Sequence, residues 1–146
     1  MKVAIASDHG GFELKQKLLQ HYQNATFEFV DLGTDSTVSV DYPDFAEKLC
    51  QTILNKQADF GVLICGTGIG ISIAANRHKG IRAALLYSLE TAKLARQHNN
   101  ANVAVFGGRT MTFAEVVERL DAFLSTEFEA GRHSRRIEKL DVYGGC

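Results

Sequence analysis

Proline is scarce in this sequence. Pro43 is the only proline among 146 residues, and the chain has no low-complexity stretch and no internal repeat. These absences exclude a flexible linker between domains and a repeat architecture, and the length suits one domain of roughly 100–200 residues. We therefore expect residues 1–146 to form a single domain.

An excess of charge of either sign is also missing. The chain has 16 Lys and Arg against 17 Asp and Glu, which leaves a net charge of −1. This balance creates no global field, so we expect neither nucleic acid nor a membrane as a partner. The longest uncharged stretch, Phe60–Asn76, contains four glycines and is shorter than the roughly 18 apolar residues of a membrane span.

Cysteine pairs and metal-ligand motifs are absent as well. The three cysteines are Cys50, Cys65 and Cys146, and neither a C-x-x-C nor an H-E-x-x-H motif occurs. This pattern argues against a disulfide framework and a zinc site, so we expect no metal and no other cofactor. Free thiols suit the reducing cytosol, and the apolar run Val3–Ala6 is too short for a signal peptide, so we expect a cytoplasmic location.

What the sequence does contain is a regular alternation of apolar runs and helical patterns. We expect strands at Lys2–Ser7, Phe27–Leu32, Phe60–Cys65, Ile81–Leu86 and Asn102–Phe106. Each run is almost continuously apolar and is followed by a helical pattern, which is typical of a parallel sheet covered on both faces. The expected fold is an α/β, Rossmann-like, three-layer α/β/α sandwich with five parallel strands and a last short helix from about Gly131.

Helices are expected between these strands. The helical patterns run through Leu14–Tyr22, Phe45–Ile53, Gly70–Arg77, Ser88–His98 and Thr112–Ser125, with the segment before Pro43 as a loop. Ligands of open parallel sheets bind outside the carboxyl ends of the strands. Candidate site residues are therefore sought where the expected strands end.

The glycine-rich segment Cys65–Ser72 follows the third expected strand. A turn of this kind directs several backbone N–H groups at one point before a helix, which suits a phosphate or an oxyanion. Cys65 would lie at the start of that helix, where the thiolate form is favoured and can act as a base or nucleophile. Because free cysteines are often buried, a simple packing role for Cys65 is an equal alternative. Cys50 lies on an apolar helix face and is expected to be core.

Polar residues also follow other elements. Asp8 and His9 end the first expected strand and suit proton transfer and anion binding, although Asp8 could instead cap the next helix. His98 and Asn99 end a helix, and capping alone could explain them. In the tail, Arg132 and Arg136 lie four residues apart on one helical face and could grip a phosphate together or form a solvated charged face.

Together, these segments resemble the ribose-5-phosphate isomerase type B family, which includes galactose-6-phosphate and allose-6-phosphate isomerases. The matching blocks occur in the family's order and are Ser7–Gly11, Asp41–Pro43, Cys65–Asn76, Arg96–Asn99, and Gly131–His133 with Arg136. The resemblance implies interconversion of ribose 5-phosphate and ribulose 5-phosphate without a metal. It also implies that the substrate is a phosphorylated sugar and that two subunits of a homodimer, or of a dimer of dimers, share each site.

The resemblance also assigns roles to individual residues. Cys65 would remove the C2 proton, Asp8 would assist proton movement between O1 and O2, and His98 with Thr67 would open the sugar ring. The residues that would hold the enediolate, the phosphate and the rest of the sugar are Gly66, Gly68, Ile69, Gly70, His9, Arg132, Arg136, Asn99 and Arg109, with Tyr42 and His133 as further candidates.

Two alternatives stay open at this point. A hexose-6-phosphate isomerase, or one subunit of such an enzyme, would use the same residues with a wider pocket. A phosphosugar-binding protein without catalytic activity would use the same pocket but would need no base, and the presence of Cys65, Asp8 and His98 argues against it.

Overall fold

A computed structural model describes residues 1–143 and contains five strands and six helices in that range. The strands are Lys2–Ser7 (β1), Glu28–Asp31 (β2), Phe60–Cys65 (β3), Ala83–Leu85 (β4) and Val103–Gly107 (β5). The helices are Phe12–His21 (α1), Tyr42–Leu54 (α2), Ile69–Ala75 (α3), Leu89–Gln97 (α4), Phe113–Ser125 (α5) and Arg132–Tyr143 (α6). Cys146 lies outside the described residues.

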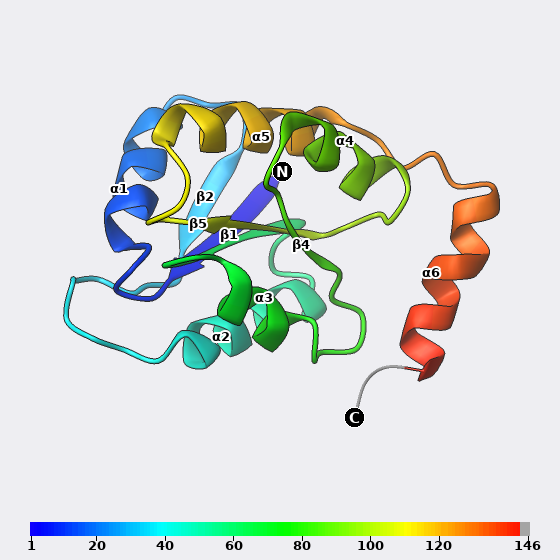
Figure 1. Cartoon of the computed structure of the whole chain (residues 1–146), viewed down its shortest axis with the longest axis horizontal. Coiled ribbons are helices and arrows are strands. Elements are labelled where there is room, and N and C mark those ends of the chain that lie inside the picture. Colours follow the sequence, from blue (N-terminus) through cyan, green and yellow to red (C-terminus); the bar gives the residue numbers. More distant parts are fainter. Residues whose placement is uncertain (144–146) are drawn as a thin grey trace.

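The sheet is parallel throughout, with the order β2-β1-β3-β5-β4. Helices α1, α4 and α5 cover one face, where Val3, Ile5 and Phe106 are buried, and α2 and α3 cover the other, where Leu63 and Val105 are buried (Figure 1). The expected three-layer α/β/α fold is therefore confirmed. None of the helices in residues 1–143 combines the length and the apolar character needed to cross a membrane.

Most expected boundaries differ from the observed ones by a residue or two, and the differences at β4 and α2 have identifiable reasons. The strand expected at Ile81–Leu86 pairs with β5 only over Ala83–Leu85, because burial extends further along this edge strand than backbone pairing does. Helix α2 begins at Tyr42, so Pro43 lies in its first turn instead of ending a loop. Proline is tolerated there because the first helical N–H groups have no partner within the helix.

The direction of the chain reverses between β1 and β3, and we call the region outside the carboxyl ends of these strands the crevice. The chain moves from β1 outward to β2, and then crosses to β3 on the other side of β1. The helices that follow the two central strands, α1 and α3, therefore lie on opposite faces of the sheet (Figure 1). In open parallel sheets, ligands bind at such a reversal, outside the carboxyl ends of the strands.

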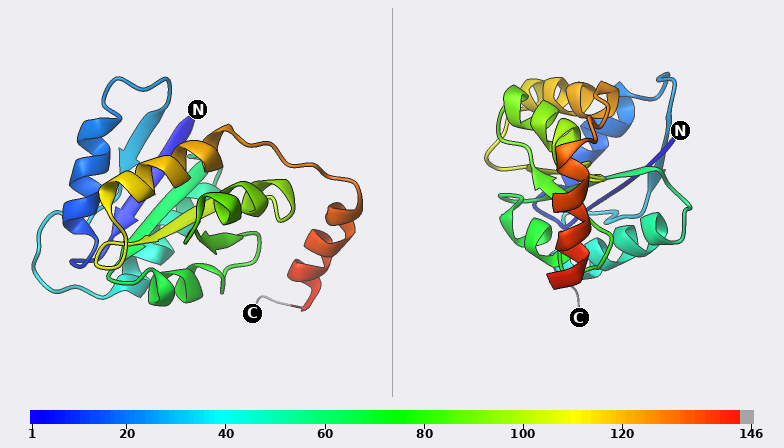
Figure 2. Two further views of the ribbon diagram at one scale, coloured as in Figure 1. Left: turned by 45° about the horizontal axis from the view of Figure 1, so that its top comes forward. Right: turned by 90° about the vertical axis from the view of Figure 1, so that its right-hand side faces the viewer.

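Helix α6 stands apart from these layers. It follows an extended segment after α5 and lies at the side of the molecule opposite the loop between β1 and α1, as two further views show (Figure 2). The amide of Gly80 donates a 3.0 Å hydrogen bond to Oδ1 of Asp141 in α6. His133, in the first turn of α6, is buried. These contacts attach α6 to the end of the sheet at which β5 begins.

Candidate active site

Three loops meet at the carboxyl ends of β1, β3 and β5. The amide of Gly108 donates a 2.8 Å hydrogen bond to the carbonyl oxygen of Cys65, and that of Arg109 donates a 2.9 Å bond to Gly66. A Cβ added to Gly108 would lie 2.5 Å from the carbonyl oxygen of Gly10, so only glycine lets these loops approach so closely. The three loops therefore form one floor beneath the crevice.

Cys65 is the last residue of β3 and is only 5% exposed. Its Sγ accepts a 3.1 Å hydrogen bond from the amide of Gly68, the residue just before α3. Gly68 has a φ of +80°, a conformation that favours glycine and turns its N–H back toward the sulfur. An N–H group directed at sulfur complements negative charge there, so the turn that the sequence predicted is built around this thiol.

The rest of the glycine-rich loop faces solvent. Oγ1 of Thr67 accepts a 3.2 Å hydrogen bond from the amide of Ile69, and both residues are exposed. The ring of Tyr42 packs against Gly70, where an added Cβ would lie 2.7 Å from the phenol carbon Cζ. Thr67 and Ile69 also line a cavity of about 430 Å³ together with Leu85, Tyr87, Thr110, Met111, Glu115 and Arg119.

Asp8 and His9 lie beside this loop. Oδ1 of Asp8 accepts a 2.9 Å hydrogen bond from the amide of Gly10, and its carboxylate is almost fully buried. Helix α1 begins later, with Gly11 as its N-cap, so the alternative that Asp8 caps this helix is wrong. Nδ1 of His9 accepts a 3.2 Å hydrogen bond from the amide of Val40, which leaves Nε2 as the protonated nitrogen of the neutral ring.

His9 and Arg109 line a second cavity of the crevice, of about 320 Å³. Its other lining residues are Gly10, Glu13, Leu14, Thr37 and Gly108. The guanidinium of Arg109 lies over Gly66, where Nη1 is 3.2 Å from an added Cβ. An imidazole N–H and a guanidinium beside the same cavity are donors suited to an anion. Thr37 was missed by the sequence analysis because the loop around it has no motif.

The remaining predicted residues lie elsewhere. His98 ends α4 and precedes β5, so it lies at the amino end of that strand, whereas Cys65 pairs with Gly107 at the carboxyl end. The five residues of β5 separate these two ends by roughly 13 Å. The expected helix-ending role is also present, because His98 is the C-cap of α4 and Asn100 has the left-handed φ of 45°.

Three predicted residues of α6 lie on the same side of the molecule as His98 and Asn99. Arg132 and Arg136 are exposed and lie four residues apart at the start of α6. Asn99 lines a cavity of about 400 Å³ whose other residues include Leu140 and Asp141 of α6. We call His98, Asn99, Arg132, His133 and Arg136 the α6-side group, and we call Asp8, His9, Tyr42, Cys65–Gly70 and Arg109 the carboxyl-edge group. One chain therefore holds the predicted site residues in two separate groups.

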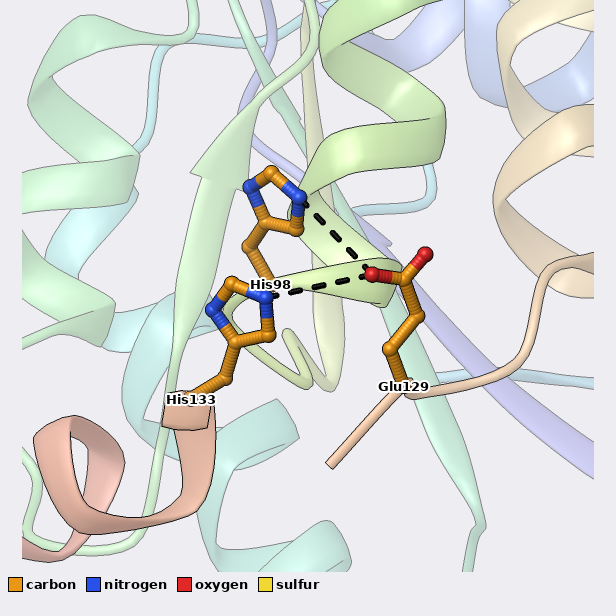
Figure 3. Close-up of side chains that lie close together, drawn as sticks. All are labelled: His98, Glu129 and His133. Carbon is orange, nitrogen blue, oxygen red and sulfur yellow. Dashed lines mark ion pairs between the residues drawn. The ribbon is translucent and has the colours of Figure 1, made fainter. Parts of the chain in front are cut away.

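Beside the α6-side group lies Glu129, a residue that the sequence analysis missed. The rings of His98 and His133 stack, with centroids 4.3 Å apart and planes 16° apart. Oε1 of Glu129 lies 4.0 Å from Nε2 of His98 and 3.8 Å from Nε2 of His133, as Figure 3 shows. Burial lowers the pKa of His133, as do the positive charges of Arg132 and His98. Glu129 lies before α6 in a segment without a motif, so no signal in the sequence marked it.

Comparison with known proteins gives consistent matches along almost the whole chain. A family model described as ribose/galactose isomerase matches residues 3–140. A putative sugar phosphate isomerase of Rickettsia bellii is 48% identical over 139 residues, which cover 95% of this chain and 96% of that protein.

Solved structures agree in fold and sequence. The crystal structure of a ribose 5-phosphate isomerase from Thermotoga maritima superimposes with a TM-score of 0.95 at 54% identity and covers 97% of each chain. The ribose-5-phosphate isomerase B of Mycoplasma genitalium, whose crystal structure contains bound ribulose-5-phosphate, has a TM-score of 0.90 at 46% identity, covering 97% of this chain and 95% of that one.

Proposed function

The chain belongs to the ribose/galactose isomerase family, and from this membership we propose that it interconverts ribose 5-phosphate and ribulose 5-phosphate. The observation that carries the proposal is the thiol of Cys65, held by the amide of Gly68 at the crevice between β1 and β3. One protein to which the chain is similar is a ribose-5-phosphate isomerase B whose crystal structure contains ribulose-5-phosphate. Packing alone does not require a hydrogen-bonded thiol where the loops of three strands meet.

Aldose–ketose isomerisation needs a base at C2 and donors for the oxygen that becomes negative. In our proposal Cys65 removes the C2 proton and returns it at C1, while the carboxylate of Asp8 moves a proton between O1 and O2. Backbone N–H groups of Gly66–Gly70 bind the enediolate, apart from those of Gly68 and Ile69, which are directed at Sγ of Cys65 and Oγ1 of Thr67. A donor directed at charge that develops only during the reaction typically contributes about 3–4 kcal/mol to the stability of the transition state.

The phosphate binds away from the reacting carbons. His9 and Arg109 line one cavity of the crevice, and Arg132 and Arg136 supply two further guanidinium groups from α6. Holding the phosphate fixes the orientation of the sugar above Cys65, so that binding energy gained at a distant group lowers the barrier at C2.

A complete site then requires two copies of the chain. His98 would donate the proton that opens the sugar ring, but it lies at the other end of β5 from Cys65. A second copy can place its α6-side group over the carboxyl-edge group of the first, and the reverse contact follows from twofold symmetry. We therefore propose a homodimer, alone or within a dimer of dimers, with each site shared between two subunits.

The surface around the crevice supports such a contact. Ile69 and Ile73 lie four residues apart on α3 and are 55% and 58% exposed, and Tyr87 beyond β4 is 67% exposed. Thr67 and Ile69 share a cavity with Tyr87, so these apolar side chains border the proposed site. A partner subunit over this surface would remove their apolar area from water as it completes the site.

The proposal is tested by a substrate panel on the purified protein. Ribose 5-phosphate, allose 6-phosphate and galactose 6-phosphate are compared for isomerisation, each with and without a chelator. We expect turnover of ribose 5-phosphate in both conditions. Faster turnover of a six-carbon substrate would reassign the enzyme to hexose 6-phosphates, and tight binding without isomerisation of any substrate would overturn the enzymatic proposal.

The proposed base also fixes the setting in which the enzyme works. Cys65 can accept a proton only as a thiolate whose sulfur is not held in a disulfide, and neither Cys65 nor Cys50 forms a disulfide in the structure. A reducing compartment keeps such thiols free, so we propose that the protein works in the cytoplasm.

A further inference from the structure

Three potential metal ligands converge at the base of α6. Nε2 of His98, Oε1 of Glu129 and Nε2 of His133 all lie within 4.8 Å of one another. They come from the end of α4, from the segment before α6 and from the first turn of α6, and Figure 3 shows the two nitrogens directed at the same carboxylate oxygen. Two separate parts of the sequence thus place three donor atoms around one point.

His133 supplies an independent indication of a ligand. Its side chain is 7% exposed, and its Nε2 is buried without a hydrogen-bond partner among the described residues. At 3.8 Å, the carboxylate of Glu129 is too distant to satisfy that nitrogen by a direct hydrogen bond. Leaving a buried polar atom unpaired is costly, so an unpaired nitrogen that faces two further donors suggests a group that binds between them.

We propose that His98, Glu129 and His133 bind a divalent transition-metal ion of the Zn²⁺ type. Two imidazole nitrogens and one carboxylate oxygen form a ligand set that suits such an ion. Bond lengths of about 2.0–2.2 Å in a tetrahedral site place the donors roughly 3.3–3.6 Å apart. The distances of 3.8 Å and 4.0 Å to Glu129 lie close to this range, and the stacked rings of His98 and His133 must turn so that their lone pairs converge on one ion.

The site has room for those movements and for a further ligand. The side chains of His98 and Glu129 are 38% and 50% exposed, whereas His133 forms the buried wall. Three protein ligands leave the fourth tetrahedral position to water. The ion would therefore enter from the solvent side and would contact His133 last.

The effect on activity rests on the proposed function. An ion on Nε2 of His98 occupies the electron pair that this nitrogen needs to carry a proton. His98 could then no longer donate a proton from Nε2 to the sugar ring. The site is therefore inhibitory, and the metal-free protein is the active form.

Binding is tested with Co²⁺ as a spectroscopic probe, added to the metal-free full-length protein. Tetrahedral nitrogen and oxygen coordination gives visible absorption bands, whereas binding to the thiol of Cys65 would add thiolate-to-cobalt charge transfer in the near ultraviolet. The test variant is Glu129→Gln, which keeps the shape but removes the charged ligand. Glu127→Gln, an exposed glutamate two residues away, is the matched control.

We expect the affinity for Co²⁺ to fall at least about tenfold in Glu129→Gln and to stay at the wild-type value in Glu127→Gln. Equal affinity in both variants, a thiolate band that disappears in Cys65→Ser, or no binding at millimolar Co²⁺ would each overturn the proposed site. In a second arm, Zn²⁺ should inhibit isomerisation of ribose 5-phosphate, and at least about tenfold more Zn²⁺ should be needed in Glu129→Gln. Co²⁺ binding is measured without substrate. The Co²⁺ titration therefore tests the metal site even if the protein does not isomerise ribose 5-phosphate.

Discussion

The amide of Gly68 donates a 3.1 Å hydrogen bond to the sulfur of Cys65, and the left-handed backbone of Gly68 makes that bond possible. A Cβ on Gly68 would lie 2.5 Å from a methyl carbon of Leu85 and 3.0 Å from the backbone of Phe106. The loop therefore depends on glycine at this position for both its conformation and its space. The proposed base is held by a turn that tolerates no side chain.

We expect Gly68→Ala to lower the free energy of unfolding by about 1–3 kcal/mol and to reduce kcat, because relief of the strain moves the amide away from the sulfur. Gly131→Ala is the matched control, since Gly131 also has a positive φ, of 60°, but an added Cβ there meets open space. Urea denaturation and initial rates measure both effects. A Gly68→Ala protein with wild-type kcat would show that this amide does not assist the thiol.

The arginines of α6 provide a test of phosphate binding. Arg132→Ala and Arg136→Ala should each raise KM by roughly tenfold or more, because a charge-assisted hydrogen bond to phosphate contributes about 1.5–3 kcal/mol. Arg135→Ala serves as the control, because Arg135 is an exposed arginine of the same helix to which no role is assigned. If all three substitutions change KM equally, general electrostatic attraction explains the effect and the two assigned contacts do not exist.

Shared sites predict that two inactive variants restore each other. Cys65→Ala lacks the proposed base of the carboxyl-edge group, and His98→Ala lacks the proposed proton donor of the α6-side group. After the two proteins are unfolded and refolded together in equal amounts, half of the dimers are mixed, and each mixed dimer has one intact site of two. Activity should return to about a quarter of the wild-type value.

The matched control refolds the Cys65→Ala and Asp8→Ala proteins together. Both substitutions lie in the carboxyl-edge group, so every mixed dimer has a defect in each site and activity should stay low. Recovery in this control, or no recovery with Cys65→Ala and His98→Ala despite mixed dimers, would contradict the shared site.

Acid should weaken the attachment of α6. Folding lowers the pKa of His133 below its ordinary value of 6.5 through burial and nearby positive charge, so the unfolded chain binds this proton more readily. The free energy of unfolding should therefore be highest above pH 6.5 and fall as the pH decreases through that value. Denaturation in the presence of a chelator at pH 7.5 and 5.5 should show a smaller decrease for His133→Gln than for wild type, while His21→Gln, at an exposed histidine, keeps the wild-type decrease.

The sequence predicted the ends of strands and helices well where they depend only on neighbouring residues. The bounds of β1 and β3 match the expected Lys2–Ser7 and Phe60–Cys65, because each apolar run ends at residues that break a strand. Ser88 and Thr112, where two of the expected helices begin, form capping boxes at the starts of α4 and α5. At β4 the apolar residues Ile81 and Leu86 are buried but lie outside the stretch that pairs with β5, so the strand is shorter than expected.

The site was predicted less completely because its parts depend on topology and tertiary contacts. His98 was expected between a helix and the next strand, and the structure shows that this position lies at the amino end of β5, away from Cys65. Glu129 lies in the segment before α6 that carries no motif, and only the fold brings it beside His98 and His133. Linear spacing shows neither relationship by itself.

The most direct test of the account follows deuterium from solvent into C2 of ribose 5-phosphate. We predict that Cys65→Ala slows this exchange by about 10²–10⁴-fold, the contribution of a general base, while the binding of inorganic phosphate is unchanged. Cys50→Ala should keep the exchange, because Cys50 is fully buried and burial raises its pKa to about 12, which leaves it protonated at neutral pH. Exchange at the wild-type rate in Cys65→Ala would contradict the assignment of Cys65 as the base.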